Sequence, residues 1–230
     1  MTFDGMPDAS RRAFLANASQ ASLLGAFGWP ALAFDEGVAA ASGAGAAVYD
    51  LSWTKRLEKA TDRALIDVPM PTEFPLQIAA RILDNCDAAY GAGKHRAVIV
   101  LNIRTRAVAM ALTQAMWTKY ALGKDVGIKG RDGNAPAISE SNPFLDLPEG
   151  GDAAYGYVTN LVQRGALAVV CDFAMGHMAN RLAQRMNLAK DDVHRELAAN
   201  LVPGAFLVPS GMFGLMKAQN LGCAYVPGGG

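Results

Sequence analysis

Residues 166–180 read ALAVVCDFAMGHMAN, and this stretch carries the pattern from which we predict the fold. The apolar run Ala166–Val170 lies between Gly165 and polar residues, which is typical of a buried parallel strand. From Met175 onward the apolar residues recur at steps of three and four, which is the spacing of a helix. Cys171 therefore stands where a strand passes into a helix, at the edge of a parallel sheet where ligands collect.

The rest of the chain alternates between strand and helix patterns. We predict further strands at residues 97–101, 125–129, 205–208 and 222–226. We predict further helices at residues 53–65, 74–90, 107–122, 153–164, 188–201 and 212–220. This alternation favours an α/β fold with a mostly parallel sheet of about five strands, joined by right-handed crossovers and covered by helices on both faces.

Composition argues against several classes of function. The chain has 230 residues with 21 basic and 21 acidic side chains, so nothing indicates an electrostatic footprint for nucleic acid. Its three cysteines include no C-x-x-C pair, which argues against a zinc site built from several cysteines. The sequence has neither a P-loop nor a G-x-S-x-G motif. We therefore expect no cofactor, and whether the protein is an enzyme stays open.

The N-terminal residues carry the features of an export signal. Ser10–Leu15 (SRRAFL) resembles the twin-arginine motif, the apolar stretch Ala21–Trp29 follows, and Ala31–Ala33 offers a small-x-small cleavage pattern. We expect residues 1–33 to be a twin-arginine-type signal peptide and the mature protein to be periplasmic. An amphipathic N-terminal helix with a chance arginine pair is the competing interpretation.

The mature chain begins with a stretch that is rich in Gly, Ala and Ser. We expect residues 34–52 to be a flexible lead and residues 53–230 to form a single α/β domain. Within that domain Gly130–Gly151 is long for a plain connection, which favours a functional loop. No apolar run in the mature chain reaches the length of a membrane span.

Several segments between Arg96 and Val226 resemble the DsrE/DsrF-like family of small α/β proteins, and the chain looks like an exported branch of it. The resemblance is carried by residues 98–104 (VIVLNIR), 115–120 (AMWTKY), 169–171 (VVC), 207–211 (LVPSG) and 218–223 (AQNLGC). It implies a flavodoxin-like three-layer sandwich and a tendency to form homo-oligomers. Some members pass sulfur as a persulfide on a cysteine after the third strand, a position that Cys171 matches. The resemblance thus implies a sulfur donor or acceptor protein as partner. The export signal and the Gly130–Gly151 insertion depart from the known sulfur relays, which are cytoplasmic.

The flavodoxin-like strand order would bring the turn after residues 97–101 beside the turn after Cys171, at the switch point of the sheet. Arg104 or Arg106 could then hold an anionic sulfur species and lower the pKa of the thiol. We predict Cys171 as the catalytic thiol, with a substrate site formed by Asn102, Arg104, Arg106, His177 and Ser210. Two plainer interpretations stay open, in which Cys171 is a small core residue and His177 is a polar surface residue.

Among the three cysteines, Cys171 is the one that we predict to react. Cys86 falls inside a helix whose neighbours pack, and Cys223 begins the last strand at the opposite end of the sheet. A helix N-terminus ahead of Cys171 favours its thiolate. Asp172 opposes this effect, because an adjacent negative charge raises a thiol pKa.

Two other functions fit the same residues. Cys171, Met175, His177 and Met178 are soft or borderline ligands that suit copper, although a methionine stripe at helical spacing is also typical of a core. The other alternative is a non-catalytic assembly module whose pocket takes a small organic ligand.

Overall fold

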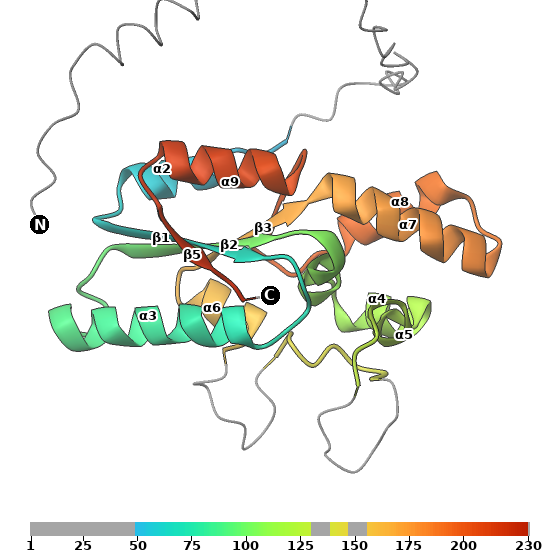
Figure 1. The fold of residues 1–230 in the computed structure, drawn as a ribbon, viewed down its shortest axis with the longest axis horizontal. Helices are drawn as coiled ribbons and strands as arrows, with labels where there is room; N and C mark the ends of the chain where they lie inside the picture. Colours follow the sequence, from blue (N-terminus) through green and yellow to red (C-terminus); the bar gives the residue numbers. More distant parts are fainter. Residues whose placement is uncertain (1–48, 130–138, 147–155, 230) are drawn as a thin grey trace, which may run out of the picture. The chain divides into compact units, whose positions relative to one another are not determined.

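Five parallel strands form a single sheet in the order β4–β3–β2–β1–β5 (Figure 1). The computed structural model describes residues 49–129, 139–146 and 156–229. The predicted signal peptide, residues 34–48 of the predicted lead and most of the Gly130–Gly151 loop lie outside the described residues. The residues that are described belong to one compact unit of the chain.

The strands are β1 (Asp62–Val68), β2 (Ala97–Ile103), β3 (Leu167–Cys171), β4 (Phe206–Val208) and β5 (Ala224–Pro227). The α-helices are α2 (Trp53–Glu58), α3 (Phe74–Tyr90), α4 (Gln114–Tyr120), α5 (Leu122–Val126), α6 (Val158–Gln163), α7 (Asp172–Met186), α8 (Lys190–Ala199) and α9 (Gly211–Asn220). A 3-10 helix, η2 (Thr105–Ala111), follows β2. No helix in the described ranges combines the length and the apolar character needed to cross a membrane.

The predicted neighbours in the sheet are confirmed. β2 pairs in parallel with β3, with Asn102 opposite Val169, and β3 pairs in parallel with β4, with Cys171 opposite Val208. The fold is an α/β sandwich of the flavodoxin-like type, as predicted. β1 was not predicted as a strand, so the strand at residues 97–101, predicted to be the first in the chain, is in fact the second.

The helix predicted at residues 53–65 is wrong over its second half. α2 ends at Glu58, and Asp62–Val68 forms the strand between β2 and β5. The charged residues around α2 give this segment a helical pattern, but the apolar run at the centre of β1 is buried in the sheet. Burial between two strands outweighs the weak local preference, because strand propensity mostly measures packing.

Two further element predictions are corrected between β2 and β3. The strand predicted at residues 125–129 is wrong, because residues 122–126 form the short helix α5, whose Val126 packs into the core. The helix predicted at residues 107–122 begins as the 3-10 helix η2, and α4 starts only at Gln114. The segment is thus helical in two parts, with a break at Leu112 and Thr113 that the apolar spacing does not reveal.

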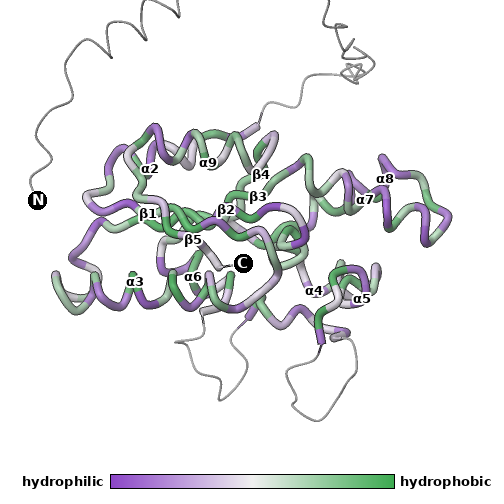
Figure 2. The backbone as a smooth tube through the Cα atoms, in the orientation of Figure 1, coloured by the Kyte–Doolittle hydropathy of each residue, from purple (hydrophilic) through white to green (hydrophobic). Residues whose placement is uncertain are grey.

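Apolar side chains fill both faces of the sheet, which explains why its strands are apolar almost throughout (Figure 2). Val98 and Val100 of β2 belong to the cluster under α2 and α9, whereas Ile99 and Leu101 belong to the cluster under α3 and α6. Figure 1 shows these two helix pairs on opposite faces of the sheet. α7 and α8 pack against each other as a further pair that follows β3.

Candidate functional site

The carboxyl ends of the central strands bring the predicted site residues together. The parallel register sets Asp67 of β1 opposite Asn102 of β2, and Asn102 opposite Val169 of β3. Cys171 ends β3 two residues later, at the same edge of the sheet. Ligands of open α/β sheets bind outside this edge. The prediction that Cys171 lies at the switch point of the sheet is wrong, because β2, β3 and β4 follow one another on one side of β1 and β5 lies on the other, so the strand order reverses at β1.

Cys171 is the N-cap of α7, and its sulfur takes part in the cap. Sγ accepts a hydrogen bond from the backbone N–H of Ala174 at 3.3 Å. The side chain is buried, with 4% of the residue exposed. The first N–H groups of a helix and the helix dipole both favour a negative charge at this position, which is the thiolate form of the cysteine.

Arg104 reaches the same edge from the end of β2 and forms a two-point ion pair with Asp67. Nε of Arg104 donates to Oδ1 of Asp67 at 2.8 Å, and Nη2 donates to Oδ2 at 2.6 Å. The hydrogen bonds to Asp67 raise the pKa of Arg104 against the lowering effect of burial, and the charges of Asp67, Tyr225 and Cys171 raise it further. The charges of Arg104 and Cys171 thus interact, and the role of Arg104 in holding an anionic sulfur species stays a prediction.

Asn102 is fully buried behind this ion pair. Its Nδ2 donates to Oδ1 of Asp67 at 3.1 Å, while its Oδ1 has no hydrogen-bond partner in the described part of the chain. A Cβ at Gly214 of α9 would lie 2.8 Å from that oxygen, and a Cβ at Gly211 would lie 2.7 Å from Cβ of Arg104. The two glycines therefore allow α9 to pack directly over the site.

Ser210 caps the helix that covers the site. Its Oγ accepts a hydrogen bond from the N–H of Phe213 at 3.2 Å, which makes Ser210 the N-cap of α9. Ser210 lies next to Gly211 and so borders Arg104 through the backbone. Whether Ser210 also contacts a substrate stays a prediction.

A second polar group beside the thiol was not found from the sequence. Asp172 accepts a hydrogen bond from the Tyr49 hydroxyl at 2.6 Å and pairs with Nε2 of His194 at 2.7 Å. Burial raises the pKa of Tyr49 to about 12, together with the hydrogen bond and charge of Asp172 and the charge of Cys171. Tyr49 and His194 thus hold the carboxylate of the residue that directly follows Cys171.

Two predicted site residues lie away from this cluster. Arg106 is exposed in η2, and His177 is exposed on α7, where its ring packs edge-on against Phe173 at 4.7 Å between ring centres. Met175 and Met178 are fully buried in the core, so α7 separates them from the exposed His177. Within the described residues, no group of three or more His, Cys, Asp or Glu side chains gathers to hold a metal ion.

The thiols of the other two cysteines have pKa values raised above the ordinary value. Burial raises the pKa of Cys223 to about 11, although the charge of Arg63 lowers it. The pKa of Cys86 is also raised, first by burial and then by the charges of Asp62 and Asp87. Cys86 is nevertheless partly exposed, so the prediction that helix packing shields it is wrong.

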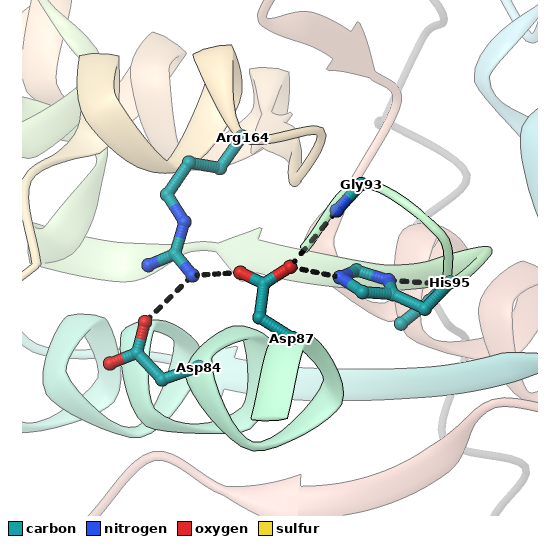
Figure 3. A network of polar contacts seen from close by, with 6 residues as sticks. Asp84, Asp87, Gly93, His95 and Arg164 are labelled. Atoms are coloured by element: carbon teal, nitrogen blue, oxygen red, sulfur yellow. Dashed lines mark hydrogen bonds and ion pairs between the residues drawn. The ribbon is translucent and has the colours of Figure 1, made fainter. Parts of the chain in front are cut away.

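A separate polar cluster lies at the amino ends of the strands (Figure 3). Asp87 accepts hydrogen bonds from Nε2 of His95 at 3.1 Å and from Nη2 of Arg164 at 3.3 Å. Nδ1 of His95 accepts the N–H of Ala97 at 3.1 Å, so the ring hydrogen lies on Nε2. His95 borders two hollows of about 400 and 340 Å³, but with both nitrogens occupied it fastens the turn after α3 rather than acting as a base.

Comparison of the chain with protein-family models, with curated proteins and with solved structures found no significant match. The chemistry proposed below therefore rests on the geometry of the Cys171 site and on the sequence segments that resemble the DsrE/DsrF-like family.

Proposed function

We propose that the mature protein is an exported DsrE-like protein that binds or relays sulfane sulfur as a persulfide on Cys171. The observation that carries this proposal is the cap of α7, in which Sγ of Cys171 accepts the N–H of Ala174 at the carboxyl edge of the sheet. A sulfur held by a helix N-terminus is biased toward the thiolate, the form that attacks sulfur. A cytoplasmic carrier would use the same chemistry, so the sulfur chemistry does not bear on location. We propose the periplasmic location on the basis of the export motif alone.

The transfer that we propose is an exchange between sulfur atoms with no net oxidation. The thiolate of Cys171 attacks the outer sulfur of a donor persulfide, R–S–SH. The new Sγ–S bond forms as the S–S bond of the donor breaks, and R–S⁻ leaves. The products are the Cys171 persulfide and the donor thiolate. For delivery, an acceptor thiolate attacks the outer sulfur of the Cys171 persulfide, and the Cys171 thiolate leaves. The proposed partner is therefore a sulfur donor or acceptor protein.

Arg104 supports this role by its charge. Its guanidinium is anchored by Asp67, and it interacts electrostatically with Cys171. A cation fixed in this way stabilises either the thiolate or the more acidic persulfide anion that replaces it. We also propose that the protein works as a homo-oligomer, as the family resemblance implies.

The experiment is sulfur loading followed by intact-mass measurement. The mature protein is incubated with inorganic polysulfide, freed from excess reagent and weighed before and after reduction. Polysulfide is the appropriate donor because the thiol is only 4% exposed and a small donor needs the least opening. We expect a mass gain of whole sulfur atoms that dithiothreitol removes.

Matched cysteine variants decide where the sulfur binds. Cys86→Ser and Cys223→Ser should load like the natural chain, while Cys171→Ser should not load. Full loading of Cys171→Ser, or no loading of the natural chain, would overturn the proposed function.

A further inference from the structure

We propose that Tyr49 and His194 are positioning residues that hold the Asp172 carboxylate beside Cys171 and thereby set the acidity of this thiol. This inference rests on the proposed function only in taking Cys171 as the reacting group.

Both oxygens of Asp172 are held by donors from distant parts of the chain. The Tyr49 hydroxyl donates to Oδ2 at 2.6 Å from a position 123 residues earlier. His194, on the neighbouring helix α8, bonds Oδ1 through Nε2 at 2.7 Å. Asp172 immediately follows Cys171 and is the first residue of α7. The carboxylate that stands next to the thiol is thus fixed from two sides.

The physical consequence follows from the charge of Asp172. A carboxylate near a thiol opposes the thiolate and raises the thiol pKa. Hydrogen bonds to both of its oxygens stabilise and localise that negative charge, so less of it acts on the sulfur. Because the pKa of Tyr49 is raised to about 12, its hydroxyl remains a hydrogen-bond donor across the pH range in which a thiol titrates.

The other charged groups around Cys171 favour the thiolate or are already paired. Arg104 faces it from the end of β2 and is bound to Asp67. Tyr225 of β5 interacts electrostatically with Arg104. Asp172 is therefore the neighbouring carboxylate that opposes ionisation of Cys171, and its two donors decide how strongly it does so.

The test is the pH dependence of iodoacetamide alkylation of Cys171 in the folded mature protein, followed by peptide mapping. Tyr49→Phe and His194→Ala each remove one donor, and we expect each to move the midpoint of the profile to higher pH. At neutral pH the rate should fall about threefold, which corresponds to a shift of about half a pKa unit. The rate plateau at high pH should stay unchanged, because the thiol is fully ionised there in every variant. His194→Gln, which retains a neutral donor, should restore most of the natural midpoint.

Two further variants separate a positioning role from a structural one. Asp172→Asn should move the midpoint to lower pH, and adding Tyr49→Phe to it should have no further effect. Tyr120→Phe is the matched control, because the Tyr120 hydroxyl donates to Glu196 in the same way and its pKa is also raised to about 12.

The inference is overturned if Tyr49→Phe and His194→Ala leave the midpoint unchanged, if Tyr120→Phe moves it equally, or if the effect of Tyr49→Phe persists in Asp172→Asn. It is also overturned if Cys171 does not react before unfolding. Failure of polysulfide loading with a normal set of midpoint shifts would remove the proposed function and leave this inference standing.

Discussion

Arg104 donates to both carboxylate oxygens of Asp67, from Nε to Oδ1 at 2.8 Å and from Nη2 to Oδ2 at 2.6 Å. Asp67 is buried, and Asn102 donates to the same Oδ1. The pair links the carboxyl ends of β1 and β2 directly beside Cys171. The ion pair therefore connects two central strands, and it also holds the Arg104 guanidinium in place as the cation of the proposed site.

Arg104→Met is expected to destabilise the fold. Removing the guanidinium leaves the Asp67 carboxylate buried and poorly compensated, which costs about 3 kcal/mol of unfolding free energy. Urea unfolding measures this loss. The control is Arg195→Met. Arg195 pairs with Asp192, and the two side chains are 75% and 69% exposed, so this variant should change the unfolding free energy by less than about 0.5 kcal/mol. Equal effects of the two variants would contradict the structural role of the Arg104 pair.

The three thiols should react in a definite order in the folded protein. Raised pKa values keep Cys223 and Cys86 protonated, whereas Cys171 caps a helix N-terminus. We expect a limiting amount of iodoacetamide at mildly acidic pH to label Cys171 first, as peptide mapping will show. Cys86 is partly exposed and is therefore the thiol that could compete with Cys171 for the reagent. If Cys86 is labelled first, or if Cys171 is labelled only after denaturant is added, Cys171 is a core residue and the sulfur proposal fails.

Asp87 should make the stability of the fold sensitive to acid. Burial raises the pKa of Asp87, but the bonds from the N–H of Gly93, from His95 and from Arg164 outweigh it, so the folded-state pKa is lowered. Such a group stabilises the fold above its unfolded pKa of about 4, and this contribution is lost as the pH falls through the folded-state value. Asp87→Asn should therefore be less stable than the natural chain at neutral pH and nearly equal to it in strong acid.

Urea unfolding at the two pH values measures this difference. Asp192→Asn, which alters an exposed pair on α8, should show no comparable change. A loss in Asp87→Asn that is the same at both pH values would indicate lost packing instead of the charge.

The export prediction is tested on the full chain in a host with a twin-arginine pathway. The native product should begin near Phe34 and lie in the periplasm, because the Arg pair and the Ala31–Ala33 site have the order of a secretory signal. Replacing both Arg11 and Arg12 by Ala should leave the precursor in the cytoplasm. N-terminal sequencing of the native product that returned Met1 or Thr2 would rule the signal out.

The sequence by itself determined the parallel α/β architecture and the place of the thiol. A buried parallel strand is apolar on both faces, so β2 and β3 appear as uninterrupted apolar runs that need no tertiary information. The polar residue at the end of each run, Asn102 and Cys171, follows from the same pattern. β1 lacked this clarity because charged residues of α2 precede it, and the sheet neighbours that bury it are distant in sequence.

Only the tertiary structure decided which side chains surround Cys171. Asp67 and Arg104 are 37 residues apart, and Tyr49 and Asp172 are 123 apart. Periodicity reports which face of an element is buried, but a hydrogen bond between distant segments leaves no local pattern. The apolar run before Pro69, interrupted by one carboxylate, was the available signal for Asp67. Nothing comparable marks Tyr49 or His194, because their role depends on how Tyr49 and α8 lie against the start of α7.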